Sequence, residues 1–339
     1  MALFRTGKVP TDVLVRNVFR YRGARDRSVI LGSSVGEDAA LVSVGKDVLV
    51  LTTDPVTGTT SQIGWSAFHV NANDVACRGA KPRWFLCDLL LPERSNAALV
   101  DAIMKQIDSA AKSLGVAVVG GHTEVTPGLK RPIVIGYMVG VVSRKSFVTS
   151  HGAQPRDQVI MTKTVGLEGT AVLATDFAYR LRKIGVRTLR RASSLRNLIS
   201  VVEDALIAVE VGGVTAMHDP TEGGLLQGVW ELAEASKVGM VIHESKISIL
   251  PETRQVCSAA RVDPLRLMSS GCLLITANRR KSDQILRKLR KRGIPANVIG
   301  AVTRRSEGRR LVKINGTIRE IRPSERDELY RVIELYQAE

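Results

Sequence analysis

Five acidic side chains in this sequence each lie in a glycine-rich or turn-rich stretch. A carboxylate at the end of a buried strand is costly to desolvate unless a cation meets it. A fold that gathers these segments must therefore also supply a positive partner. The five acids are Asp38 in Gly36-Glu37-Asp38-Ala39-Ala40, Asp54 in Thr52-Thr53-Asp54-Pro55, Asp74 in Asn71-Ala72-Asn73-Asp74, Glu124 in Gly120-Gly121-His122-Thr123-Glu124, and Asp219 in His218-Asp219-Pro220-Thr221-Glu222-Gly223-Gly224.

Hard oxygen ligands of this kind suit Mg²⁺, which proteins usually hold through one or two carboxylates together with substrate phosphates. The chain is otherwise strongly basic, with 49 Lys and Arg against 33 Asp and Glu, so the acidic set indicates a site and not a general acidic surface. Taken singly, each acid could instead cap a helix or lie in a surface turn, as Asp54 or Asp219, each followed by proline, would. The predicted metal site therefore depends on the whole set.

The length of 339 residues exceeds the size at which one hydrophobic core usually stops growing, about 250–300 residues. We expect one domain over residues 1–149 and another over 150–339, with the turn-rich stretch Ser150 to Asp157 between them. Apolar residues make up 44% of the chain and charged residues 24%, as in globular proteins. No stretch approaches the roughly 20 apolar residues that cross a bilayer, and residues 1–10 hold no apolar signal core, so we expect a cytoplasmic protein without membrane contact.

The four cysteines form no Cys-x-x-Cys pair and no zinc-binding spacing. Each has at least one apolar neighbour in the sequence, so we expect reduced, buried thiols that act as small hydrophobic residues. The four are Cys77, Cys87, Cys257 and Cys272.

Much of the net charge of +16 comes from two basic runs, Arg180 to Arg196 and Arg279 to Arg292. Such runs can bind nucleic acid or polyphosphate. Aromatic residues make up only 4% of the chain, and no nucleic-acid motif or stacking platform accompanies the runs. We therefore favour solvated helix faces and keep nucleic-acid binding as a minor alternative.

The spacing of apolar residues predicts alternating strands and helices in the first half, which indicates an α/β domain, and a mixed α+β pattern in the second. In the first half we expect a short helix after Pro10, two strands within Leu41 to Leu51, a helix over Ile63 to Cys77, a strand over Trp84 to Leu91, a helix over Asn96 to Leu114, a short buried strand over Val116 to Val119 and a strand over Ile133 to Val142. In the second we expect strands over Val159 to Thr162, Met240 to His243, Leu273 to Ala277 and Ala296 to Val302, and helices over Thr170 to Ala178, Leu198 to Val211 and Gly224 to Ala235.

No GxxxxGK[ST] loop and no GxGxxG between a strand and a helix is present, which excludes ordinary P-loop and Rossmann proteins. Gly120-Gly121 could bring backbone N–H groups close to a phosphate, because glycine permits the approach. Gly166-Leu167-Glu168-Gly169 before a helix offers a second anion-facing turn. Both stretches are also compatible with plain turns.

Together, several stretches resemble the motifs of the AIR synthase-related (PurM-like) ATP-binding superfamily, whose members include aminoimidazole ribonucleotide synthase, thiamine-monophosphate kinase, selenophosphate synthetase and the hydrogenase maturation factor HypE. Order and spacing match across nearly the whole chain. The stretch His218 to Gly224 makes the HypE-like branch the most similar. The motifs are Gly36-Glu37-Asp38-Ala39-Ala40, Thr52-Thr53-Asp54, Asn73-Asp74-Val75-Ala76 with Gly79-Ala80-Lys81-Pro82, Val119-Gly120-Gly121-His122-Thr123, Asp219-Pro220-Thr221-Glu222-Gly223-Gly224 and Ser269-Ser270-Gly271.

The resemblance implies a two-domain PurM-like architecture. The sheet of an N-terminal α/β domain would pair with that of a second subunit in a dimeric β-barrel, so the protein would be a homodimer. A C-terminal α+β domain would pack beside it, with ATP and Mg²⁺ in the cleft between the two.

The resemblance also assigns roles residue by residue. Asp38, Asp54 and Asp74 would hold Mg²⁺, supported by Glu124 and Asp219. Asp54, Asp74 and His122 would be the catalytic residues. The residues expected to contact the nucleotide are Gly36, Glu37, Asn73, Gly120, Gly121, Thr123, Thr221 and Gly223.

Three departures limit what the resemblance implies. His122 stands where several relatives carry an acidic metal ligand, so either Glu124 replaces that ligand or the metal has fewer protein ligands. The chain ends Leu335-Tyr336-Gln337-Ala338-Glu339, without the terminal cysteine that receives the modified group in HypE, so we do not expect self-modification. No cysteine precedes Cys77, unlike the selenophosphate branch.

The leading hypothesis is an ATP- and Mg²⁺-dependent enzyme that uses the γ-phosphate to phosphorylate or activate a small-molecule or amide-like oxygen, with an unidentified small or carbamoyl-type substrate. In such chemistry the protein mainly positions groups and neutralises charge. One alternative is a non-catalytic nucleotide-binding partner in a maturation complex. Another is an RNA-associated basic protein.

Overall fold

A computed structural model describes residues 4–338 of the chain. The chain forms two compact units. The first-sheet unit comprises residues 27–32 and 38–147, and the second-sheet unit comprises residues 4–26, 33–37 and 148–338. The N-terminal segment thus belongs with the second half of the chain, while the division into 1–149 and 150–339 as folding domains stays a prediction.

The first-sheet unit is built on six strands in the order β1-β2-β3-β6-β4-β5. All neighbours are antiparallel except β4 and β5, which run parallel. The two strands expected within Leu41 to Leu51 are present as β2 and β3, joined at Gly45. Within one chain the sheet is open, so the dimeric barrel stays an expectation. The strands are β1 (Val29–Leu31), β2 (Ala40–Val44), β3 (Asp47–Val56), β4 (Lys81–Leu91), β5 (Ala117–Val125) and β6 (Ile133–Ser143).

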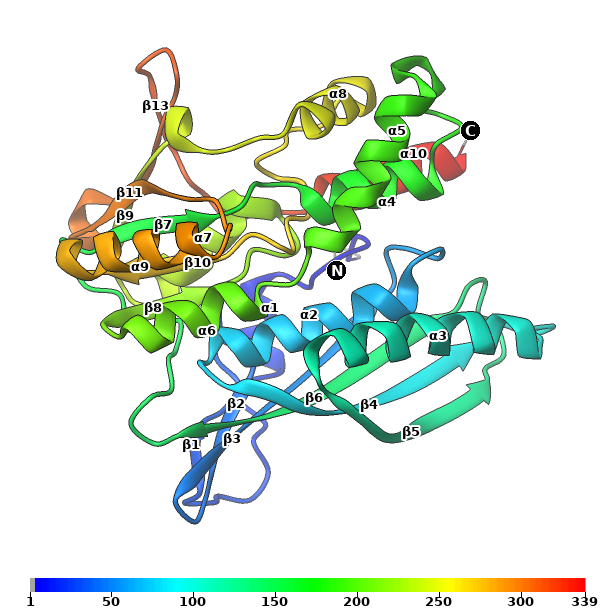
Figure 1. The fold of residues 1–339 in the computed structure, drawn as a ribbon, viewed down its shortest axis with the longest axis horizontal. Helices are drawn as coiled ribbons and strands as arrows, with labels where there is room; N and C mark the ends of the chain where they lie inside the picture. The colour runs from blue at the N-terminus through cyan, green and yellow to red at the C-terminus, as the bar shows by residue number, and fades with distance from the viewer. Residues whose placement is uncertain (1–3, 339) are drawn as a thin grey trace. The chain divides into compact units, whose positions relative to one another are not determined.

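Two helices cover one face of this sheet, α2 (Ile63–Cys77) and α3 (Ala97–Leu114), as Figure 1 shows. Both predicted helices are confirmed. The Asn96 side chain caps α3 by accepting from the backbone N–H of Leu99, and Gly115 ends it with a left-handed φ of 65°. Helix α2 has 14 of its 15 residues buried, and these include the polar residues Asn71, Asn73 and Asp74.

The opposite face of the first sheet is apolar and only half-buried. Buried and half-buried residues alternate along β4 and β6, because successive side chains point to opposite faces of a sheet. No described helix of this unit packs on the half-buried face. Its side chains include Trp84, Leu86, Leu90, Ile135, Val139 and Val141.

The expectation of a short buried strand over Val116 to Val119 is wrong in length and in burial. The strand β5 is longer, and each of its residues is exposed, Val119 by 53%. The reason is its place at the sheet edge, where β4 is its only strand neighbour. An apolar run indicates a strand but does not distinguish a central strand from an edge strand.

The second-sheet unit holds seven strands in the order β13-β12-β9-β11-β7-β10-β8. All neighbours are antiparallel except β12 and β9. The strands are β7 (Gln158–Thr162), β8 (Val214–His218), β9 (Gly239–His243), β10 (Leu274–Ala277), β11 (Ala296–Thr303), β12 (Arg309–Val312) and β13 (Ile318–Glu320).

Helices pack on this second sheet and beside it. Helix α7, confirmed over the predicted residues, joins the main core with Leu225, Val229 and Leu232, while α9 packs on β7, β10 and β11. A separate helical core gathers α4, α5, α8 and α10. The helices are α4 (Leu167–Asp176), α5 (Val186–Ser194), α6 (Val202–Val211), α7 (Gly224–Ala235), α8 (Pro251–Ala260), α9 (Arg279–Lys291) and α10 (Glu328–Ala338), with short 3₁₀ turns at Arg182–Ile184, Leu195–Leu198, Glu244–Lys246 and Arg305–Glu307.

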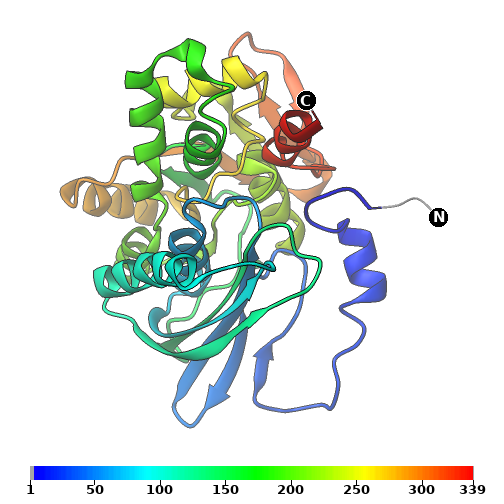
Figure 2. The same ribbon diagram turned by 90° about the vertical axis from the view of Figure 1, so that its right-hand side faces the viewer.

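The N-terminal segment carries α1 (Thr11–Asn17), which has no buried residue. In Figure 2 the chain before α1 passes beside α10, drawn in dark red. The backbone N–H of Lys8 donates to Oε2 of Glu222 at 2.9 Å, which ties this segment to the turn before α7.

The predicted state of the cysteines is confirmed, since all four are free and buried. Burial raises the pKa of the Cys257 thiol to about 12, which keeps it protonated and unreactive. Among the residues that the structure describes, no helix has both the length and the apolar character needed to span a bilayer.

Candidate functional site

Two of the predicted metal ligands come together in the first-sheet unit. One carboxylate oxygen of Asp38 and one of Asp74 lie within 4.8 Å of each other. The hydroxyl of Thr52, on β3, lies 2.8 Å from Oδ2 of Asp74 and 2.8 Å from the carbonyl oxygen of Asp38. A strand, a helix and the segment before β2 therefore meet at this point.

Asp54 lies two residues after Thr52 on the same strand, so its side chain points to the same face of the sheet. That face is the one that α2 covers. The side-chain Oδ1 of Asn71 accepts from the backbone N–H of Asp54 at 2.9 Å, and its Nδ2 donates to the Asp54 carbonyl at 3.2 Å. Asn71 and Asp74 stand three residues apart on α2, which places both on the side that meets β3.

Gly136, on β6, makes this contact possible. In the register of the sheet it lies opposite Asp54. A methyl group at position 136 would come within 2.3 Å of Nδ2 of Asn71 and 2.9 Å of a ring carbon of Phe85. Only glycine leaves room there for the Asn71 side chain to reach the strand.

The pair of Asp38 and Asp74 is suited to a divalent cation. Two carboxylates this close repel each other unless a positive charge lies between them. The donors are hard oxygens, which Mg²⁺ prefers. Asp74 is 2% exposed and Asp38 is half-buried, so an ion held here would keep one side open toward a ligand.

The Gly120-Gly121-His122-Thr123-Glu124 stretch lies on β5, three strands from β3 in the sheet order. At about 4.8 Å per strand this amounts to roughly 14 Å. Within one chain the structure therefore does not bring Glu124, His122 or Thr123 beside Asp54. Their roles stay predictions.

Glu124 and His122 form an exposed pair, with His122 Nε2 3.2 Å from Glu124 Oε2. The hydroxyl of Thr126 also donates to Glu124 at 2.8 Å. The hydrogen bond from Thr126, with that from His122, lowers the pKa of Glu124 below its ordinary value. Glu124 is thus an anion at neutral pH, as a metal ligand must be.

Asp88 on β4 holds this stretch in place. Its Oδ1 accepts from the backbone N–H of His122 at 3.0 Å, and its Oδ2 accepts from the hydroxyl of Tyr137 at 3.1 Å. At Gly121 a methyl group would come within 1.9 Å of the Cys87 carbonyl oxygen, so the close approach of β5 to β4 requires glycine.

Glu37 and Gly36 belong to the second-sheet unit. The Glu37 side chain is 1% exposed and accepts from the backbone N–H of Ser150 at 3.0 Å and from Nδ1 of His151 at 2.7 Å. Gly36 has a left-handed φ of 74°. The structure gives Glu37 a role in holding the chain near residue 150, and its contact with nucleotide stays a prediction.

The turn from Asp219 to Gly224 joins β8 to α7. Asp219 is 1% exposed, and Nε2 of the neighbouring His218 lies 2.9 Å from Oε2 of Glu231. The backbone N–H of Gly223, which we expected to contact nucleotide, donates to Oδ2 of Asp327 at 2.6 Å. Desolvation raises the pKa of Asp327 to about 7.

The Thr221 carbonyl accepts from the backbone N–H groups of Gly224 and Ser269. Asn73 is fully buried on α2, in the first-sheet unit. The assignments of Asp219, Thr221, Gly223 and Asn73 as ligand contacts stay predictions.

Four residues that position the acids were not among the predicted site residues: Thr52, Asn71, Asp88 and Gly136. For Asn71 a signal exists, because an amide three residues before Asp74 shares its helix face. For Gly136 and Asp88 the signal is strand register, which the sequence does not supply.

Two family patterns match the chain. The AIR synthase related protein, N-terminal domain, matches residues 36–142, and the AIR synthase related protein, C-terminal domain, matches residues 154–313. A protein of Methanocaldococcus jannaschii named for hydrogenase expression and formation is 28% identical over 284 residues, which is 80% of this chain and 81% of that protein. The carbamoyl dehydratase HypE of Cupriavidus necator is 30% identical over 260 residues, 74% of this chain and 70% of that protein.

Solved structures show the same fold. HypE of E. coli superposes with a TM-score of 0.73 at 26% identity, covering 84% of this chain and 88% of that one. A HypE solved in complex with ATP gives a TM-score of 0.71 at 22% identity, covering 83% and 87%. The fold and motifs define a two-domain, PurM-like protein with mixed α/β content. The chain belongs to the AIR synthase-related family, and within it to the HypE-like branch.

Proposed function

We propose that this protein is an ATP- and Mg²⁺-dependent enzyme that uses the γ-phosphate to activate the oxygen of a small amide-like or carbamoyl-type substrate. The observation that carries the proposal is the pair of Asp38 and Asp74 carboxylate oxygens within 4.8 Å. Asp54 lies on the same face of the sheet and is held there by Asn71.

In this proposal Asp38, Asp54 and Asp74 hold the Mg²⁺ ion. When bound, Mg²⁺ neutralises phosphate charge and ATP supplies the phosphoryl group that turns a poor leaving oxygen into a good one. Thr52 keeps the Asp74 carboxylate oriented by its hydrogen bond. The roles of Gly120, Gly121 and Thr123 at the phosphates, and of Glu124 and Asp219 as supporting ligands, stay expectations from the resemblance, because within one chain β5 lies roughly 14 Å from β3.

The relatives support the choice of chemistry. Several HypE proteins named carbamoyl dehydratase align with this chain, and one HypE was solved with ATP. The test is ATP consumption, followed as phosphate release with purified protein, Mg²⁺ and a panel of carbamoyl and carboxamide compounds. We expect release that depends on one compound class, and its loss in Asp74→Asn.

Asp108→Asn is the matched control, because Asp108 lies exposed on α3 in an ion pair with Lys112. If Asp74→Asn releases phosphate as fast as Asp108→Asn, the metal assignment fails. If the protein binds ATP and no compound on the panel stimulates release, the non-catalytic nucleotide-binding partner is the better description.

We also propose a homodimer that covers the half-buried face of the first sheet. This face carries a row of large apolar side chains from β4 and β6 that no described helix of its unit covers. Apolar patches of this kind on a monomer mark interaction sites. A second copy of the same sheet would bury it symmetrically.

A further inference from the structure

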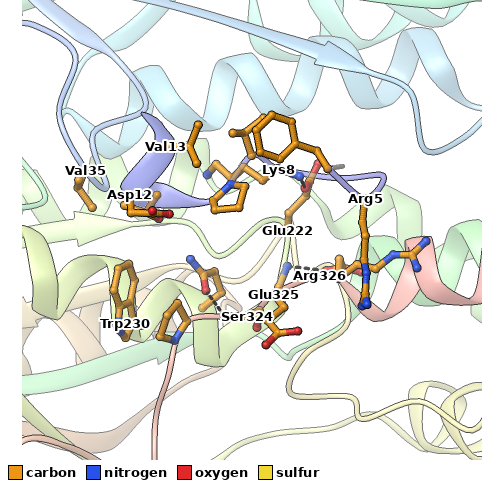
Figure 3. Close-up of a pocket in the computed structure, with 18 of the residues that line it drawn as sticks. Arg5, Lys8, Asp12, Val13, Val35, Glu222, Trp230, Ser324, Glu325 and Arg326 are labelled. Carbon is orange, nitrogen blue, oxygen red and sulfur yellow. Dashed lines mark hydrogen bonds between the residues drawn. The ribbon is translucent and has the colours of Figure 1, made fainter. Parts of the chain in front are cut away.

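The second-sheet unit contains a cavity of about 830 Å³ that the proposed function does not use. Four parts of this unit line it: the N-terminal segment with α1, Val35, helix α7 with the turn before it, and the loop 323–327 before α10 (Figure 3). Cavities of about 300–1,000 Å³ are the size that holds small organic ligands.

One part of the lining is apolar and rigid. Trp230 and Pro323 both line the cavity, and in Figure 3 the indole of Trp230 faces the segment that carries Asp12 and Val13. Proline and tryptophan lose little side-chain entropy when a ligand packs on them. The guanidinium of Arg309 lies 5.3 Å from the centre of the Trp230 ring and helps to hold it in position. A flat apolar body would pack well here.

The charge of the lining is opposite to that of the chain. Of the charged residues around the cavity, five are acids and three are bases, although the chain has 49 Lys and Arg against 33 Asp and Glu. The acids are Asp12, Glu222, Glu234, Glu325 and Asp327, and the bases are Arg5, Lys8 and Arg326.

Residues outside the lining neutralise several of these charges. Lys8 Nζ lies 3.4 Å from Oε1 of Glu231, and Arg326 pairs with Glu334. Asp12 and Glu234 in turn pair with arginines that do not line the cavity, Arg16 and Arg309.

Two acids of the lining, Glu222 and Asp327, accept hydrogen bonds from neutral donors. Glu222 accepts from the backbone N–H of Lys8 at 2.9 Å and from the hydroxyl of Tyr330 at 3.0 Å. Asp327 accepts from the backbone N–H groups of Gly223 and Leu329, each at 2.6 Å. Neutral donors orient the Glu222 carboxylate but leave its charge in place. Asp327 adds less charge, because burial raises its pKa to about 7. The lining is therefore anionic around Glu222.

We propose that this cavity binds a small organic cation with a flat apolar body, its amine directed to Glu222 and its body packed on Trp230 and Pro323. The charge balance selects a cation over an anion of the same shape, while Trp230 offers packing surface to either. The proposal does not depend on nucleotide binding or turnover.

The test is isothermal titration calorimetry without nucleotide, using 1-naphthylmethylamine and 1-naphthoic acid as probes. The two share one aromatic body and differ in the sign of their charge. We expect the amine to bind one site per chain and the acid to bind at least about tenfold more weakly. A tenfold difference corresponds to about 1.4 kcal/mol of binding free energy. Glu222→Gln keeps one of the two acceptor oxygens and removes the charge, and we expect it to abolish the preference for the amine.

Trp230→Ala should weaken both probes equally, because it removes packing surface and no charge of the lining. The matched control is Glu307→Gln, an exposed acid paired with Arg310 on the surface, which should not alter binding. Should Glu222→Gln fail to fold, Glu325→Gln changes an exposed acid of the same lining. The proposal is overturned if the amine does not bind, if both probes bind equally, or if the charge variants bind like wild type.

Discussion

The side-chain amide of Asn71 pairs with both backbone polar groups of Asp54, accepting from its N–H at 2.9 Å and donating to its carbonyl at 3.2 Å. The two residues lie on different elements, helix α2 and strand β3. The Asn71 amide therefore fixes the position of α2 relative to β3. Through α2 it also fixes the distance between Asp74 and Thr52. The geometry of the proposed metal ligands depends on this contact.

Replacing Asn71 by leucine tests that dependence. Leucine is close in volume but cannot pair with the strand, so the backbone groups of Asp54 lose their partner. We expect the free energy of unfolding to fall by about 1–3 kcal/mol and Mg²⁺-dependent ATP binding to weaken. Urea denaturation and calorimetry measure the two effects. Asn96→Ala, which removes the cap of α3, should cost about 1 kcal/mol of stability and leave ATP binding unchanged; equal binding losses in both variants would refute the role of Asn71.

Because His69 is buried, we predict that the first-sheet unit loses stability in acid. Burial lowers the pKa of His69 from 6.5 to about 4, so between these values the unfolded chain binds the proton and the folded chain does not. The free energy of unfolding should therefore fall as the pH drops from 6.5 toward 4, by up to about 1.4 kcal/mol per pH unit. His69→Leu should remove this component. Emission from Trp65, whose ring centre is 4.4 Å from that of His69, follows the transition; parallel curves for the two proteins would contradict the prediction.

For Asp327, in the second-sheet unit, we predict a pH dependence of stability opposite in sign to that of His69. Burial raises the pKa of Asp327 from 3.8 to about 7, so in this range the folded state binds the proton more tightly. The contribution to the free energy of unfolding is largest below pH 4 and is lost as the pH rises toward 7, by up to about 1.4 kcal/mol per pH unit. Denaturation of wild type and Asp327→Asn, followed by the emission of Trp230, should show the difference. A difference in the free energy of unfolding between the two proteins that does not vary with pH would contradict this prediction.

The proposed dimer predicts that a charge on the half-buried face of the first sheet separates the subunits. Val139, on β6, lies on this face, and Val139→Glu would force a carboxylate to be desolvated in the interface. We expect a dimer for wild type and a monomer for this variant in sedimentation velocity. Val186→Glu serves as control because Val186 is 73% exposed in the other unit. A monomeric wild type, or a dimeric Val139→Glu, would overturn the proposal.

Local signals in the sequence predicted much of the fold. The bounds of α2 and α7, and those of α3 to within one residue, followed from the spacing of apolar residues. The exposed strand β5 did not, because exposure depends on which strands become neighbours. The acids Asp38 and Asp74 were predicted to share a site, and they do lie together. Their supports Thr52, Asn71 and Gly136 act through contacts between elements, and of the three only Asn71 has a local signal, its spacing from Asp74 on α2.

Long-range contacts also explain why the link between Gly223 and Asp327 was missed. The two residues are separated by 104 positions, and nothing in the sequence around Asp327 distinguishes it from a surface acid near a helix start. Only the folded chain shows that the Asp327 carboxylate accepts a hydrogen bond from the Gly223 N–H at the beginning of α7. The expectation that Gly223 contacts nucleotide rested on the motif alone.

The most direct test of the magnesium site is calorimetric titration of ATP with and without Mg²⁺, in wild type, Asp74→Asn and Asp108→Asn. If Asp38 and Asp74 share a divalent ion that bridges to the nucleotide, wild type and Asp108→Asn should bind ATP tightly only with Mg²⁺. Asp74→Asn should lose most of that gain, about tenfold or more in affinity. An affinity that is the same with and without Mg²⁺, or the same in Asp74→Asn as in wild type, would contradict the account.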